Sequence, residues 1–137
     1  MSFALLSRAG RSRLMSRIRS TNTAPERVVR CTAFSMGFRF RIHDPRLPGK
    51  PDIVFRAKRK VVFVNGCFWH QHRGCKDCQV PAKRTAYWTA KFQATKLRDR
   101  QARAALRRAG WSVLTIWECE TRQPARLRTL LAEFLTD

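Results

Sequence analysis

The sequence predicts an α/β or α+β domain in which helices flank a central mixed sheet. Three observations lead to this prediction. The expected elements run in the order helix, three strands, helix, strand, helix. The chain has 137 residues, enough for one domain with one hydrophobic core. Its hydrophobic fraction of 44% is normal for a globular protein. Because we find no internal repeat or linker, we expect a basic arm over residues 1–22 and a single domain over residues 23–137.

The arm is rich in serine and arginine, including Arg17, and we expect it to order on a phosphate backbone. A frayed, solvated terminus explains the same composition without a ligand.

The domain is expected to begin with a helix. The capping box Thr23-Ala24-Pro25-Glu26 predicts where this helix starts, and Gly37 is expected to end it after about Met36. Residues 38–42 alternate apolar side chains with arginine, which predicts a half-buried strand. Residues 43–51 contain three prolines and a glycine and predict a loop.

Two short β-branched runs, 52–55 and 61–64, are separated by the basic segment 56–60 and predict a hairpin. Residues 111–117 predict a further core strand. Residues 124–135 predict a last amphipathic helix that turns leucines and a phenylalanine inward.

Between these strands we expect a long helix over residues 85–109, ended by Gly110. Positions spaced alternately by four and three share one face of this helix: Trp88, Phe92, Thr95, Asp99, Ala102 and Leu106. The carboxylate of Asp99 therefore lies in the stripe that faces the core, although the helix has many solvent-facing positions.

The charge of the chain indicates a polyanionic partner. Lys and Arg number 29 against 9 Asp and Glu, for a net charge of +20. Such a field favours nucleic acid. A membrane surface is the second possibility, but we find no basic helix with a wide apolar face. A basic protein without chemistry, of the ribosomal type, is the plainest alternative. Since no secretory signal and no apolar run of about 18 residues is present, we expect a cytoplasmic protein that does not enter the membrane.

Nine residues that begin at Cys67 hold two thiols, two imidazoles and two bulky aromatic side chains. Cys67, His72 and Cys75 are close enough in sequence to wrap one zinc ion, which takes four thiolate or imidazole ligands in a structural site. The spacing leaves Cys78 and Cys119 as candidates for the fourth ligand. The alternative is a set of ordinary thiols near a surface histidine.

The remaining side chains of this stretch allow two uses each. His70 is either a further metal ligand or a general acid/base. Phe68 and Trp69 either stack on DNA bases or cover the metal site.

The acidic residues are few, so each is a candidate ligand for Mg²⁺, which prefers oxygen. Asp52 opens a strand and Glu26 lies in the first helix. The capping box by itself also explains Glu26, and a turn beside Pro51 also explains Asp52.

Several motifs occur in a fixed order between Arg11 and Glu120, and together they resemble the very short patch repair endonucleases. The motifs are Leu47-Pro48-Gly49-Lys50-Pro51-Asp52, Val62-Phe63-Val64-Asn65-Gly66-Cys67-Phe68-Trp69-His70, Arg98-Asp99-Arg100, Ala109-Gly110-Trp111 and Trp117-Glu118-Cys119-Glu120. The resemblance implies a Mg²⁺-dependent, strand-specific endonuclease. It would nick duplex DNA 5′ to the T of T:G mismatches that arise when 5-methylcytosine deaminates. It also implies the α/β fold of type II restriction enzymes, of PD-(D/E)XK type, with a structural zinc site.

Carried over to matching positions, the resemblance implies that Asp52 and the backbone carbonyl of Val64 hold one or two Mg²⁺ ions. His70 would be the catalytic histidine, oriented by Asp99. Glu26 would act through the water shell of the metal.

The same resemblance implies a Zn²⁺ site formed by Cys67, His72, Cys75 and Cys119. It implies an aromatic wedge beside the mismatch formed by Phe68, Trp69 and Trp88. We also expect Arg17 and Lys50 to contact DNA. Partners would include mismatch-repair factors and a cytosine-5 methyltransferase, and we expect a monomer associated with the bacterial nucleoid.

Two features depart from the expected patterns. Restriction-type sites usually carry an acid and a lysine on the strand after the first aspartate, and residues 62–65 have neither; in this family a histidine takes over the function of the lysine. Asn65 stands where some members have histidine, which would alter a phosphate or water contact. The alternatives are a related restriction-type nuclease of other specificity and a non-catalytic, zinc-stabilised DNA-binding module.

Overall fold

A computed structural model describes residues 23–76 and 78–136, so the basic arm and Arg17 lie outside the described residues. The helices and strands follow the predicted order. They are α2 (Ala24–Ser35), β1 (Arg41–Ile42), β2 (Ile53–Phe55), β3 (Lys60–Asn65), α3 (Thr85–Arg108), β4 (Ser112–Trp117) and α4 (Pro124–Leu135). Short 3-10 helices follow β2 (Arg56–Lys58) and β4 (Glu118–Arg122).

The four strands form one mixed sheet in the order β1-β2-β3-β4. β2 and β3 form the predicted antiparallel hairpin, with Ile53 opposite Val62. β3 and β4 are parallel, with Val62 opposite Leu114, and α3 connects them. A parallel pair needs such a crossover, whereas antiparallel neighbours can be joined by a short turn.

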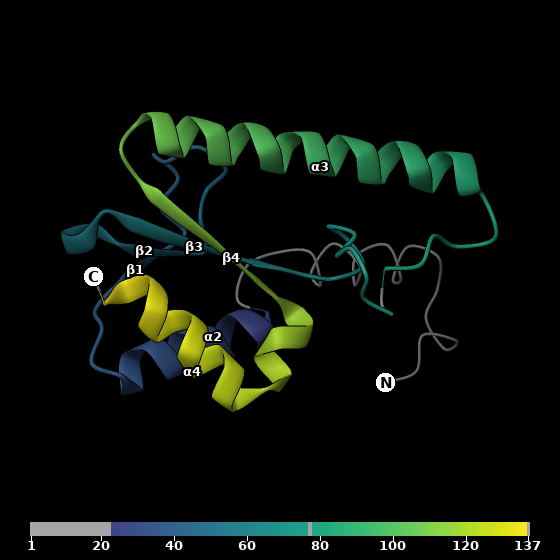
Figure 1. Cartoon of the computed structure of the whole chain (residues 1–137). Coiled ribbons are helices and arrows are strands. Elements are labelled where there is room, and N and C mark those ends of the chain that lie inside the picture. The colour runs from purple at the N-terminus through teal and green to yellow at the C-terminus, as the bar shows by residue number, and fades with distance from the viewer. Residues whose placement is uncertain (1–22, 77, 137) are drawn as a thin grey trace, which may run out of the picture.

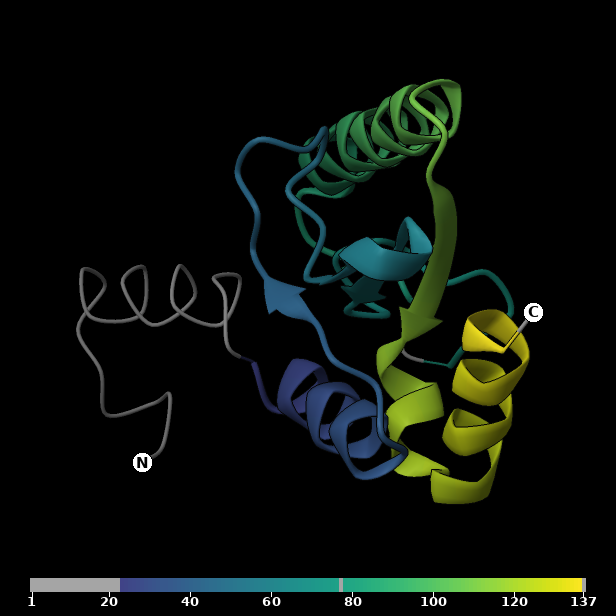
Figure 2. The same ribbon diagram turned by 90° about the vertical axis from the view of Figure 1, so that its left-hand side faces the viewer.

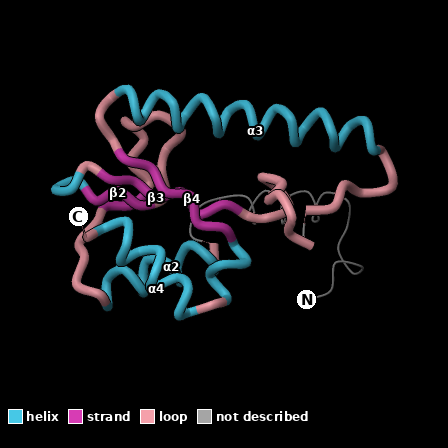
Figure 3. The backbone as a smooth tube through the Cα atoms, in the orientation of Figure 1, coloured by secondary structure: helices cyan, strands magenta, loops and turns pink. Residues whose placement is uncertain are grey.

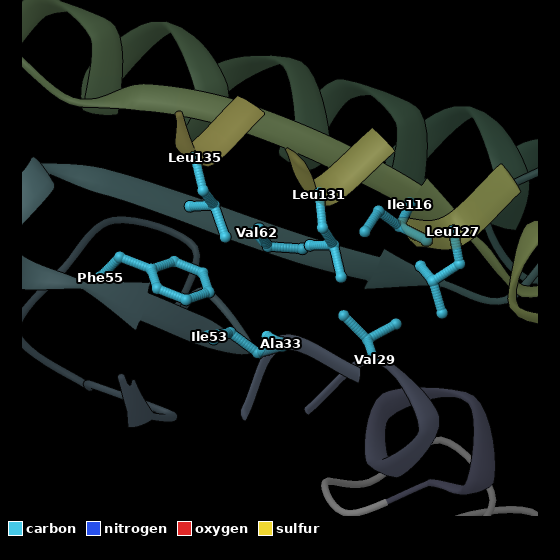
Figure 4. Close-up of a cluster of buried hydrophobic side chains, with 9 residues drawn as sticks. All are labelled: Val29, Ala33, Ile53, Phe55, Val62, Ile116, Leu127, Leu131 and Leu135. Atoms are coloured by element: carbon cyan, nitrogen blue, oxygen red, sulfur yellow. The ribbon is translucent and has the colours of Figure 1, made fainter. Parts of the chain in front are cut away.

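Helices cover both faces of the sheet (Figures 1 and 2). α3 crosses one face, and α2 and α4 lie side by side on the other. Figure 4 shows the larger core cluster between the sheet and α2 and α4: Val29, Ala33, Ile53, Phe55, Val62, Ile116, Leu127, Leu131 and Leu135. The alternate strand residues Val54 and Val61 pack instead with Leu106 of α3. This alternation is the period of two expected of a strand buried on both faces.

The first strand is shorter than the sequence predicts. β1 comprises Arg41–Ile42 alone, and Phe38 and Phe40 precede it as irregular chain. The register pairs Arg41 with Val54, so the strand could extend by one further pair at most, Phe40 with Phe55. Beyond Phe55 the chain turns into the 3-10 helix that begins at Arg56. The rings of Phe38 and Phe40 pack edge-on against Phe55 instead.

The helices agree closely with their predicted ranges. The Thr23 hydroxyl accepts a hydrogen bond from the backbone N–H of Glu26 at the start of α2, and the predicted stripe of α3 is buried or half-buried. Residues 66–76 and 78–84, which connect β3 to the first turn of α3, contain no helix or strand among the described residues (Figure 3). Within the described part of the chain, no helix combines the length and apolar character that crossing a membrane requires.

Candidate active site

A cleft of about 800 Å³ opens at the carboxyl end of β3, between the start of α2 and the middle of α3. Its lining contains most of the residues singled out from the sequence: Glu26, Lys50, Asp52, Val64, Asn65, Phe68, Trp69, His70 and Asp99. These residues come from two helices, one strand and two loops. The fold therefore brings together positions up to 73 apart in sequence, from Glu26 to Asp99.

Asp52 lies immediately before β2, and its carboxylate accepts a hydrogen bond from the backbone N–H of Val64, with an oxygen–nitrogen distance of 2.7 Å. Burial and the neighbouring carboxylate of Glu26 raise the pKa of Asp52 to about 8, against the opposing effect of the Val64 N–H. A divalent cation placed beside this carboxylate would stabilise its charged form.

The Val64 carbonyl is available for the same purpose. In an extended strand the N–H and C=O of one residue point toward the same neighbouring strand. Since the N–H of Val64 points to Asp52, its carbonyl belongs on the same side. The Asp52 carboxylate and the Val64 carbonyl both offer oxygen atoms, which are the ligands that Mg²⁺ prefers.

Glu26 is buried, with 2% of its surface exposed. Its Oε2 lies 2.8 Å from Nε2 of His43 and 3.8 Å from a guanidinium nitrogen of Arg30. Sequence reasoning assigned no role to His43, although the chain has only three histidines. One ligand atom each from Glu26, His43 and Asp52 lies within 4.8 Å of the others.

His70 and Asp99 form a hydrogen-bonded pair in the cleft. Nδ1 of His70 lies 2.7 Å from Oδ2 of Asp99. A tight turn places the histidine, because its backbone N–H bonds to the carbonyl of Gly66 at 3.1 Å. Asp99 reaches it from the middle of α3. The pair is accessible to solvent, with side chains 27% and 24% exposed. The observed contact gives a physical reason for an acidic residue in the buried stripe of α3.

Four thiol and imidazole side chains converge where the loop after β3 meets the end of β4. We call Cys67, His72, Cys75 and Cys119 the cysteine–histidine cluster; one ligand atom of each lies within 4.8 Å of the others. Nδ1 of His72 is 3.7 Å from Sγ of Cys67 and 3.5 Å from Sγ of Cys119. Among the described residues Cys78 is not within this group. The geometry therefore favours Cys119 over Cys78 as the fourth candidate ligand.

The thiols of this cluster are poorly suited to being charged on their own. Burial raises the pKa of Cys67 to about 12 and also raises the pKa of Cys119. A bound cation reverses this preference by deprotonating the thiols that coordinate it. The ring of His72 is also stacked on Trp117, with centroids 4.2 Å apart.

The aromatic residues form a separate cluster that joins the loop to α3. The ring centroid of Phe68 lies 5.0 Å from that of Trp69, 5.7 Å from that of Trp88 and 5.2 Å from that of Phe92. Phe68 and Trp69 line the cleft. The ring that stacks on His72 is Trp117, so these two side chains extend toward α3 instead.

Basic side chains border the cleft on two sides. Lys50 is exposed and follows Gly49, where the chain passes so close to α3 that an added Cβ would lie 2.5 Å from Cβ of Ala102. On the other side of His70 is a cavity of about 470 Å³. Four cationic residues line this cavity: Arg73, Lys96, Arg100 and Arg103.

Comparisons with known proteins identify the family of this chain. The model of the family described as DNA mismatch endonuclease Vsr matches residues 4–79. The type II nicking enzyme V.XorIIP of Xanthomonas oryzae pv. oryzae is 48% identical over 130 residues, which cover 92% of this chain and 95% of that protein.

Two further relatives are equally informative. The type II nicking enzyme V.NmeAIP of Neisseria meningitidis is 40% identical over 121 residues, covering 88% of this chain and 86% of that protein. The DNA mismatch endonuclease Vsr of Escherichia coli is 40% identical over 120 residues, covering 88% of this chain and 76% of that protein. The chain is a DNA endonuclease, and it belongs to the family of the DNA mismatch endonuclease Vsr.

Proposed function

We propose that this endonuclease nicks one strand of duplex DNA on the 5′ side of the thymine in T:G mismatches left by deamination of 5-methylcytosine. The observation that carries the proposal is the joint presence in one cleft of Asp52, the His70–Asp99 pair and the aromatic side chains Phe68 and Trp69. Relatives named for mismatch cleavage and for nicking support the specificity and the single-strand cut, respectively.

Asp52 and the carbonyl of Val64 would hold Mg²⁺, with Glu26 near enough to act through a water molecule. The donor set fits, because all of these ligand atoms are oxygen and because two adjacent carboxylates repel each other without a cation. When bound, the ion would stabilise the negative charge that builds on the phosphate in the transition state.

His70 would act as the general base that takes a proton from the attacking water. Its Nδ1–H donates to the Asp99 carboxylate in the tautomer we assign, which leaves Nε2 free to accept a proton. Nε2 would take the proton of the water that attacks phosphorus, and Asp99 would stabilise the imidazolium that results. The pair lines the cleft that also contains Asp52, so it is within reach of a phosphate bound there.

The aromatic side chains Phe68, Trp69 and Trp88 would enter the base stack at the mismatch. Their mutual contacts anchor them to α3, so a ring that wedges between bases is supported from behind. A T:G wobble pair is easier to unstack than a matched pair, which gives selectivity before any base is contacted.

Phosphate affinity would come from Lys50, from Arg17 of the arm and from the four cationic residues of the cavity beside His70. The net charge of +20 makes this affinity steeply dependent on salt, because each neutralised phosphate releases counterions.

The cysteine–histidine cluster would hold Zn²⁺ with a structural role. Three thiols and one imidazole suit this ion, and four protein ligands close the site. Bound there, the ion would fix the loop that carries Phe68, Trp69 and His70 to the end of β4. We also infer a monomer that acts in the cytoplasm on the bacterial nucleoid, alongside mismatch-repair factors and a cytosine-5 methyltransferase that generates the methylated sites.

The test is a nicking assay with the full chain, Mg²⁺ and end-labelled duplexes that carry a T:G mismatch, the matched T:A pair or uracil opposite guanine in the same context. We expect one nick, 5′ to the thymine, on the T:G duplex only. Equal cutting of the matched duplex would overturn the mismatch specificity. It would favour a nicking enzyme of other specificity, which the names of two relatives make the second candidate.

A further inference from the structure

A histidine beside the carboxylates of the cleft has no part in the function proposed above. His43 follows β1, and its backbone N–H donates to the carbonyl of Asp52 at 3.3 Å. Its Nε2 lies 2.8 Å from Oε2 of Glu26. α2 therefore contributes one side chain to this point, and the two ends of the loop between β1 and β2 contribute one each.

The distances suit a shared ion. A divalent cation with bonds of about 2.1 Å keeps neighbouring ligand atoms about 3 Å apart. The separation of 2.8 Å between Glu26 and His43 is close to this value, and Asp52 completes a group that spans no more than 4.8 Å. Little movement is needed for all three atoms to face one ion.

The environment also favours a cation at this point. The Glu26 side chain is 3% exposed and the His43 side chain 15% exposed, so water competes weakly for them. Two carboxylates meet there, and the guanidinium of Arg30, at 3.8 Å, is a distant partner for Glu26. Both Glu26 and Asp52 line the cleft, which gives an ion a path from solvent.

We propose that Glu26, His43 and Asp52 bind a divalent transition-metal ion, with Nε2 of His43 as the nitrogen ligand. An imidazole combined with two carboxylates favours ions such as Mn²⁺, Fe²⁺ or Co²⁺ over Mg²⁺, which takes oxygen ligands and keeps much of its water. The inference rests on the proposed function in one respect: the ion shares Asp52 with the proposed Mg²⁺ site. An ion bound there is expected to support nicking at lower concentration than Mg²⁺.

The experiment uses Mn²⁺ itself as the probe and the full chain with its cysteine–histidine cluster loaded with Zn²⁺. Mn²⁺ prefers oxygen and nitrogen to thiolate, so it does not compete for that cluster. Pulsed electron paramagnetic resonance detects a nitrogen bound directly to Mn²⁺. Because the chain has only three histidines, single variants assign the signal. His43→Gln keeps an amide that can donate to Glu26, and His70→Gln is the matched control in the same cleft.

We expect nitrogen coupling in the native chain and in His70→Gln, and its loss in His43→Gln together with a weakening of Mn²⁺ affinity by about tenfold or more. No coupling in the native chain would overturn the inference and leave His43 as a hydrogen-bond partner of Glu26. Coupling that survives in His43→Gln would overturn it as well. If His43→Gln does not fold, ¹⁵N-histidine labelling of the native chain and of His70→Gln provides the same decision.

The result is separable from that of the nicking assay. Nitrogen coupling assigned to His43 without T:G nicking would leave this inference standing and overturn the proposed function. T:G nicking with Mg²⁺ but no nitrogen coupling to Mn²⁺ would support the proposed function and overturn this inference.

Discussion

The cleft and the cysteine–histidine cluster both gather metal-ligating side chains, but they differ in chemistry and in connectivity. The cluster combines two thiols and an imidazole from one short loop with the thiol of Cys119 in the 3-10 helix that follows β4, which makes four protein ligands. The cleft brings Glu26 and Asp52 together from separate elements, offers oxygen atoms, and opens into about 800 Å³ of space.

Under the proposed function, this difference separates the site expected to stabilise the fold from the site expected to perform the chemistry. A closed set of four ligands leaves no position for substrate, whereas an open set does. The two regions nevertheless share one physical feature. In both, burial and like neighbours disfavour the charged form of the ligands, as the raised pKa values of Asp52 and Cys67 indicate. Each region is therefore expected to be stabilised by its own kind of cation.

The largest effect is expected from Asp52→Ala, which should abolish metal binding in the cleft without affecting zinc binding by the cysteine–histidine cluster. Loss of the central ligand should reduce the nicking rate at least about a thousandfold, because the phosphate charge is no longer neutralised. DNA binding, measured by fluorescence anisotropy, and zinc content should stay close to those of the native chain. Nicking that persists at a comparable rate would show that the metal is held elsewhere.

Cys119→Ser should abolish zinc binding by the cysteine–histidine cluster. We expect loss of bound zinc and a fall in the free energy of unfolding of about 3 kcal/mol or more, because the ligand connects β4 to the loop after β3. Zinc analysis and chemical denaturation measure both quantities. Cys78→Ser is the matched control and should change neither, because Cys78 lies outside the cluster. The opposite order of effects would exchange the roles of the two cysteines.

Asp99→Asn tests the link between the two regions, since His70 lies on the loop that the cluster supports. The amide keeps the shape but no longer favours the imidazolium, so the nicking rate should fall about 100-fold with little change in stability. The measurement is the nicking rate against pH in saturating Mg²⁺. A loss that matched a change in zinc content would indicate a structural role for Asp99 instead.

The smallest effect is expected from Asp52→Asn on the stability of the chain without divalent cations in the cleft. The folded pKa of Asp52, about 8, is above its unfolded value. This residue therefore costs stability progressively as pH rises from about 4 to about 8. Asp52→Asn should remove that cost and stabilise the chain by about 1 kcal/mol at pH 8, with less effect at pH 5.

Urea denaturation in buffer freed of divalent cations by an exchange resin measures this difference and leaves the zinc in place. Adding Mg²⁺ should stabilise the native chain more than the variant. A variant that is less stable than the native chain at pH 8 would contradict the assignment.

The helices could be predicted closely from local chemistry. Pro124 and the leucine pattern after it define α4, and the four-and-three spacing defines the buried face of α3. The first strand could not, because its length depends on its partner strand. β2 ends at Phe55, which leaves no pairing position for Phe38, and the rings of Phe38 and Phe40 pack against Phe55.

The candidate site divides in the same way. Residue types and motif order alone pointed to Asp52, His70 and an Asp99 placed toward the core, and the family comparison agrees with the class of enzyme they imply. Spacing left Cys78 and Cys119 open and the resemblance implied Cys119; the tertiary structure places Cys119 in the cluster. It alone revealed the contact of His43 with Glu26. The physical reason is that spacing reports on neighbours within one element, whereas these contacts join segments that only the packing of α2, the sheet and α3 brings together.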